Sequence, residues 1–323
     1  VLYFFTALTS IFTQIFVPAE ASLIPTYVPA KWLLSANALF TMTFYSAILG
    51  GFVGGGPLLS FFGENYVLLI LIVLFGISAV LSLFLPKGAA GDKVYPLNLN
   101  IAVNDLVEVL RFIRKKEAIF QALALVTVAQ AVMAIFATLG PGFADRILLV
   151  KLTDASLIIL APAALGMIAG TLIVGSIGTR FKKRDLINWG ILSSGFLLTF
   201  VALFIRSQNS RVVSAFFEDI FSFSLSSGLL PISAVCFFLL GFANSLIDIS
   251  CNTVLQERTD TKMRGRVYGL LGSSISGVAV LPVLVSGVMA DFIGIGKIIF
   301  GLGIGLMMFG FFTWRMKPNS LTN

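Results

Sequence analysis

The sequence contains no histidine and, in 323 residues, only two cysteines. Without histidine the chain cannot form a His-ligated zinc site, a Ser-His-Asp triad or the HExxH motif of metalloproteases. Cys236 and Cys251 fall in one expected helix, where their spacing of 15 residues separates them by roughly 22 Å, too far for a disulfide bond. A Gly-x-x-x-x-Gly-Lys-Ser/Thr loop for ATP is also absent. These absences predict no metal site and no cofactor, and they argue against an enzyme.

Charged residues are scarce as well. They make up 11% of the chain, whereas 58% of residues are hydrophobic, and soluble domains usually carry about 25% charged residues. The apolar residues do not alternate with polar ones as in a membrane β-barrel. They form long blocks, and about 20 residues of helix cross a hydrocarbon core of roughly 30 Å. The sequence therefore predicts an all-α polytopic membrane protein with nine spans, near residues 1–24, 36–62, 66–86, 117–143, 155–178, 186–205, 229–256, 267–290 and 296–315.

The basic residues are divided unevenly between the two sides of such a protein. When alternate connections are assigned to opposite sides, 17 of the 22 lysines and arginines fall on the side of Lys31. Because Lys and Arg in short loops stay in the cytoplasm, this side is predicted to be cytoplasmic, together with the C-terminus. The net charge of +7 then reflects topology, and it gives no reason to expect nucleic acid as a partner.

One long connection divides the chain. Residues 87–116 begin with glycine and proline breakers and continue with apolar residues at helical spacing, which predicts a cytoplasmic linker with an amphipathic helix. Three spans precede it in residues 1–86, and six follow it in residues 117–323. Transporters are often built from repeated halves. We therefore expect three further spans ahead of Val1, and hence an incomplete reading frame or a truncated chain.

Two stretches resemble a known family. "FVPAEASLIPTYVPAKWLLSANAL" (Phe16–Leu39) is similar to the segment between helices 4 and 5 of drug exporters in the major facilitator superfamily. "NTVLQERTDTKMRGRVYGLLGS" (Asn252–Ser273) is similar to their loop between helices 10 and 11. The third drug-proton antiporter branch, which includes macrolide and siderophore exporters, matches best. The resemblance implies a major facilitator fold in which helices 4 to 12 of twelve are present. Thr179 departs from it, because the gate motif of the family has an aspartate there.

A cytoplasmic gate is predicted at the charged segment "ERTDTKMRGR" that begins at Glu257. Basic side chains at this end can pair with carboxylates when the gate is shut and separate when it opens, and Gly265 would let the next helix start sharply. The alternative is a solvated loop that obeys the positive-inside rule. An echo of the gate motif, "GSIGTRFKKR", and an acid between two prolines of the first span complete the predicted gate, which consists of Glu20, Gly175, Arg180, Arg184, Glu257, Arg264, Gly265 and Arg266.

Asp248 is the only acidic residue well inside a predicted span. A carboxylate at membrane depth costs at least about 2.5 kcal/mol, so it normally faces a cavity or a partner. Amides at four-residue spacing share its helix face, and the first and fourth spans carry polar stripes with one glutamine each. The alternative is that these side chains form structural hydrogen bonds between packed helices. The predicted proton and substrate path consists of Gln14, Gln130, Asn244, Asp248 and Asn252, and Gln256 continues the row.

The resemblance implies a secondary active transporter that exports small amphipathic compounds by alternating access, in the cytoplasmic (inner) membrane of a prokaryote. The absence of an ATP-binding loop favours a proton gradient as the source of energy. The expected partners are a small-molecule substrate, protons and the lipid bilayer, and the expected state is a monomer. The alternative function is that of a truncated, non-transporting remnant or a membrane scaffold.

Overall fold

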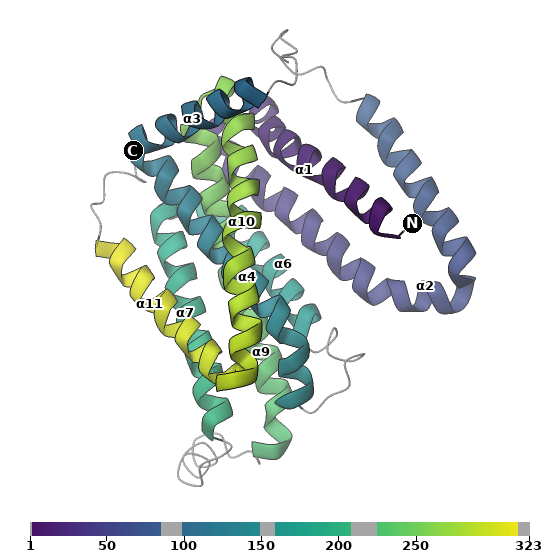
Figure 1. Ribbon diagram of the computed structural model, residues 1–323, viewed down its shortest axis with the longest axis vertical. Helices are drawn as coiled ribbons and strands as arrows, with labels where there is room; N and C mark the ends of the chain where they lie inside the picture. The colour runs from purple at the N-terminus through teal and green to yellow at the C-terminus, as the bar shows by residue number, and fades with distance from the viewer. Residues whose placement is uncertain (1, 85–98, 149–158, 208–224, 316–323) are drawn as a thin grey trace.

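The computed structural model describes residues 2–84, 99–148, 159–207 and 225–315. Over these residues the chain forms helices and no strand (Figure 1). Residues 87–98 of the predicted linker lie outside the described residues. The elements are α1 (Leu2–Tyr27), η1 (Ala30–Trp32), α2 (Leu33–Leu83), α3 (Leu99–Lys115), α4 (Glu117–Arg146), α6 (Ala161–Ile177), η3 (Gly178–Arg180), α7 (Lys183–Ser207), α9 (Leu225–Arg258), α10 (Thr261–Ile293) and α11 (Ile295–Arg315).

Nine segments within the described residues are long and apolar enough to cross a membrane, which confirms the predicted spans. One of them, Leu58–Leu83, lies in α2, and another, Ala30–Gly51, begins in η1 and continues into α2. Between its two straight parts α2 bends at Gly63, where φ is 75°. Glycine adopts a positive φ without the steric penalty of a Cβ atom, so this residue marks the point where one predicted span ends and the next begins.

The six helices that follow α3 form one body. In it α9 packs against α4, α6 and α7, while α10 packs against α4 and α11 against α7. The approach of α6 to α9 is very close: a Cβ atom on Gly166 would lie 1.8 Å from the carbonyl oxygen of Phe238, and one on Gly241 would lie 2.0 Å from that of Ala163. Small residues are what allow membrane helices to make such contacts.

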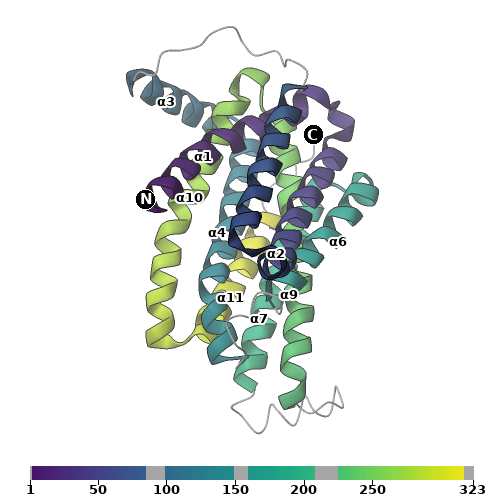
Figure 2. The ribbon, with the colours of Figure 1, turned by 90° about the vertical axis from the view of Figure 1, so that its right-hand side faces the viewer.

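The first two helices lie along one side of this body. α2 packs against α6 and α9, and α1 packs against α10. Figures 1 and 2 show α1 and the first part of α2 meeting the body at the end that carries α3 and sloping away from it, and in Figure 1 the second part of α2 turns back after the bend. Lys183 of α7 pairs with Glu257 of α9 there, and Lys116 pairs with Asp260. We refer to the end that carries η1, η3, α3 and the start of α10 as the basic end.

α3 lies across the basic end (Figure 1). Its Val109 and Ile113 side chains are buried in the apolar core of the six-helix body, whereas Leu106, Val107 and Leu110 are exposed. The helix is thus amphipathic, as the spacing of its apolar residues requires. The buried apolar residues fix α3 to the body, and the exposed apolar residues face away from it.

Candidate functional site

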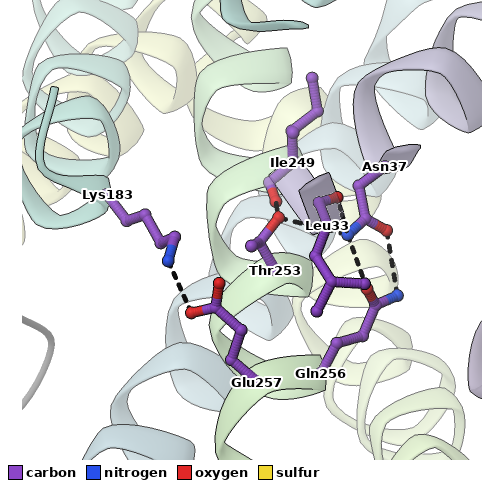
Figure 3. A network of polar contacts seen from close by, with 7 residues as sticks. All are labelled: Leu33, Asn37, Lys183, Ile249, Thr253, Gln256 and Glu257. Carbon is purple, nitrogen blue, oxygen red and sulfur yellow. Dashed lines mark hydrogen bonds and ion pairs between the residues drawn. The ribbon is translucent and has the colours of Figure 1, made fainter. Parts of the chain in front are cut away.

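The contact between α2 and α9 at the basic end is formed by two buried amides (Figure 3). Nδ2 of Asn37 donates to Oε1 of Gln256 at 2.7 Å, and Nε2 of Gln256 donates to Oδ1 of Asn37 at 3.0 Å. Nδ2 of Asn37 also lies 3.2 Å from Oγ1 of Thr253. The two amide residues are 4% and 1% exposed. Since a buried amide without a partner is costly, this pair favours the arrangement in which α2 and α9 stay together.

Apolar side chains seal the same end beside the amide pair. Leu34 and Ala38 of α2 form a buried cluster with residues of α6, α7 and α9. Oγ of Ser35 donates to the carbonyl oxygen of Gly175 on α6 at 3.0 Å. A Cβ atom on Gly175 would lie 3.0 Å from Cβ of Ala38. α2 is therefore in direct contact with both α6 and α9, and the basic end is closed along this line.

Ion pairs surround the closed contact. Nζ of Lys183 lies 2.6 Å from Oε2 of Glu257, which joins the start of α7 to the end of α9 (Figure 3). Nη1 of Arg266 lies 2.7 Å from Oε2 of Glu108 on α3. The predicted gate residues Glu257 and Arg266 thus both have charged partners. In these two pairs the partners belong to α7 and to α3.

The other predicted gate residues lie at the same end but in different settings. Nε of Arg264 donates to the carbonyl oxygen of Thr259 at 3.2 Å, and Nη2 of Arg184 donates to that of Trp314 at 2.7 Å. α10 begins at Thr261, so Gly265 lies inside this helix and not at its start. Arg180 is exposed in η3, and Glu20 is partly buried on α1.

Asp248 lies on α9 eight residues before Gln256, which is about 12 Å deeper along the helix. The residue is partly exposed. Nδ2 of Asn252 donates to its Oδ1 at 3.1 Å, and the Gln130 side chain of α4 lies close to the carboxylate. Tyr45 of α2 lies close to Asn244. The structure therefore brings four of the five predicted path residues together.

The fifth predicted path residue, Gln14, lies elsewhere. It is exposed on α1, and its Oε1 atom is 3.7 Å from the position that a Cβ atom on Gly272 of α10 would take. A cavity of about 240 Å³ is lined by residues of α4, α6, α7, α9 and α11. Asn244 and Ser194 are the polar side chains among its lining residues, and aromatic and aliphatic groups make up most of the rest. Asn244 thus links the surroundings of Asp248 to an apolar cavity.

Comparison with known proteins places this arrangement in a family. A family model described as the Major Facilitator Superfamily matches residues 1–232. The chain belongs to the major facilitator superfamily. It is also 24% identical, over 318 residues, to the "Uncharacterized MFS-type transporter YfiS" of Bacillus subtilis (strain 168), in an alignment that covers 97% of this chain and 70% of that protein. The chain is thus a multi-pass membrane transporter, as the resemblance implied, and not an enzyme.

Several residues of the transporter's site had no signal of their own in the sequence. Asn37 is one amide in the apolar start of α2, and its partner lies 219 positions away. Tyr45 and Ser35 likewise belong to none of the periodic polar patterns described above. Lys183 belongs to a run of basic residues in which nothing distinguishes the one that pairs with Glu257. The one available hint for Asn37 was its place in the stretch Phe16–Leu39 that resembles the family.

Proposed function

We propose that this transporter exports small amphipathic compounds in exchange for protons, and that Asp248 is the group that carries the proton. The observation that supports this most is the setting of Asp248: a half-buried acidic residue inside a span, with Asn252 hydrogen-bonded to its carboxylate and the Gln130 side chain beside it. A carboxylate at membrane depth is usually functional because its charge is costly there. Proton binding removes the charge, and proton release restores it.

The closed basic end gives the proton path a direction. Asp248 lies beyond the contact of Asn37 with Gln256, so protons reach it from the side opposite the basic end in this arrangement. The excess of basic residues makes the basic end, with the C-terminus, cytoplasmic. In this proposal, a proton from outside binds Asp248, and the basic end then opens. The proton leaves to the cytoplasm, and substrate from the cytoplasm enters the transporter. The reverse change then carries substrate outward, which is alternating access.

Two other features support the details of the proposal. The cavity beside Asn244 is lined mostly by apolar groups, which fits the apolar part of an amphipathic substrate. The stretches Phe16–Leu39 and Asn252–Ser273 resemble drug-proton antiporters of the third branch. The moving units are residues 1–86 and 117–323, joined by the linker 87–116, and a monomer of the inner membrane of a prokaryote is sufficient for this motion.

The test is transport into vesicles that hold the chain with its basic end outside. With an acidic lumen, the wild type should accumulate a fluorescent amphipathic dye, and an uncoupler should abolish the accumulation. Asp248→Asn keeps the shape and most hydrogen bonds but cannot titrate. This variant should still bind the dye with an unchanged Kd, yet accumulate no more than empty vesicles do.

The matched control is Asp291→Asn, because Asp291 is an exposed acid that pairs with Arg146 at 3.1 Å near the other end of the bundle. It should accumulate dye like the wild type. Uphill accumulation by Asp248→Asn at the wild-type rate would show that Asp248 is structural. Accumulation that is insensitive to the uncoupler would contradict proton coupling itself.

A further inference from the structure

A second pocket, of about 250 Å³, lies at the basic end between the connection from α1 to α2 and the connection from α6 to α7. Three lysines line it, Lys31 from the first connection, Lys182 from the second and Lys183 from the start of α7, together with one acid, Glu257. It shares no lining residue with the apolar cavity, and Asp248 does not line it. The pocket is therefore separate from the proposed transport path.

Positive charge exceeds negative charge in this pocket. Glu257 is neutralised by one of the three lysines, because its Oε2 atom lies 2.6 Å from Nζ of Lys183. The ammonium groups of Lys31 and Lys182 remain as an excess, and both residues are exposed. The pocket therefore has a net positive charge that attracts anions, even with Glu257 present.

Uncharged donors add to the lysines. α7 begins at Lys183, so the N-terminal end of this helix, with its partial positive charge, lies at the pocket. The hydroxyl group of Thr179 belongs to a lining residue as well. A phosphate group offers several acceptor oxygens and up to two negative charges, whereas a carboxylate offers two oxygens and one charge. The number of donors and the excess of positive charge fit the phosphate better.

We propose that this pocket binds the phosphate group of an anionic ligand, with Lys31 and Lys182 as its principal contacts. Lys31 precedes α2 and Lys182 precedes α7, so the bound phosphate joins the first helices to the six-helix body. It does so at the end where Asn37 and Gln256 hold the two groups together. A ligand that needs both lysines binds the closed arrangement better than an open one, and this differential affinity stabilises the closed basic end.

The experiment measures binding of radiolabelled inorganic phosphate to the detergent-solubilised chain at constant ionic strength, with chloride as the competing anion. The double variant Lys31→Gln/Lys182→Gln should raise the Kd by about tenfold or more, because it removes two charge-assisted contacts. Lys31→Arg/Lys182→Arg should bind like the wild type. Lys115→Gln is the matched control, since Lys115 is an exposed lysine of α3 at the same end.

A parallel measurement separates a soluble phosphate from a lipid headgroup. The same proteins are extracted from vesicles of phosphatidylglycerol and phosphatidylcholine in equal amounts, and the retained lipids are counted by native mass spectrometry. Saturable binding of inorganic phosphate that is lost in the double glutamine variant assigns a soluble ligand. Retention of phosphatidylglycerol that is lost in that variant assigns the headgroup. If wild type and double glutamine variant are alike in both measurements, the proposal is wrong, and export by the Asp248 path is unaffected.

Discussion

Asn37 and Gln256 are the residues that hold the two helix groups together most specifically. Each amide donates to and accepts from the other, and each is almost fully buried. In apolar surroundings the two amides have few other partners, so separation is unfavourable unless water enters. A gate built in this way is stable when closed and can still open, because water can replace both hydrogen bonds.

A double-mutant cycle tests the pair. Asn37→Ala and Gln256→Ala should each lower the free energy of unfolding in detergent, and the double variant should lose less than the sum of the two. The expected coupling is about 0.6 kcal/mol, the average for hydrogen bonds between membrane helices, with about 1.7 kcal/mol as an upper limit. Strict additivity would mean that the amides do not stabilise one another.

The two kinds of polar residue differ in how well the sequence revealed them. Asp248 was identifiable because an acid far from the ends of an apolar run is rare and costly. The four-residue spacing of Asn244, Asn252 and Gln256 also placed their side chains on its helix face. Asn37 was not identifiable, because one amide gives no periodic pattern and its partner is decided by tertiary packing. Sequence reasoning thus located the row on α9 but not the residue of α2 that meets it.

At the scale of helices, close packing between α6 and α9 fixes the surface on which α2 rests. The glycines at Gly166 and Gly241 bring the two backbones together, and α2 then contacts α6 through Gly175 and α9 through Gln256. A change in the spacing of α6 and α9 would therefore displace both halves of the contact with α2 at once.

Gly166→Val should disrupt this packing. Its Cβ atom would lie 1.8 Å from the carbonyl oxygen of Phe238, so the helices must separate, and overpacking of this kind costs about 1–3 kcal/mol or more. The Tm in detergent should fall clearly. Gly305→Ala serves as control, because nothing lies within 4 Å of a Cβ atom at Gly305, and it should leave the Tm unchanged or slightly higher. Equal values for the two variants would refute the role of the close contact.

The existence of the helices was more predictable than their ends and neighbours. Run length and composition gave the nine spans, and the structure adds the bend at Gly63 between the second and third of them. The start of α10 was misplaced, because the segment from Thr261 to Gly265 is polar and basic yet helical. The contacts between helices depend on small residues such as Gly166. The contact partners of such residues cannot be predicted from a single sequence.

For the whole molecule, orientation is the first property to test. Arg180 and Lys297 are both exposed, and they lie at opposite ends of the bundle. In a Cys236→Ala/Cys251→Ala background, Lys297→Cys should react with an impermeant thiol reagent in intact cells, whereas Arg180→Cys should react only after permeabilisation, because the basic end is cytoplasmic. The opposite labelling pattern would invert the proposed direction of transport.

The central claim is that the basic end must open between α2 and α6 during transport, and a reversible cross-link tests it most directly. A Cβ atom at Gly175 would lie 3.0 Å from Cβ of Ala38, close to the roughly 3.5–4.5 Å of a disulfide. In the same cysteine-free background, Ala38→Cys/Gly175→Cys is oxidised, and dye accumulation is measured before and after reduction. Each single cysteine variant, treated with the same oxidant, is the control. The cross-linked protein should not transport, and reduction should restore transport; a fully cross-linked protein that transports as fast as the reduced one would show that the basic end need not open between α2 and α6.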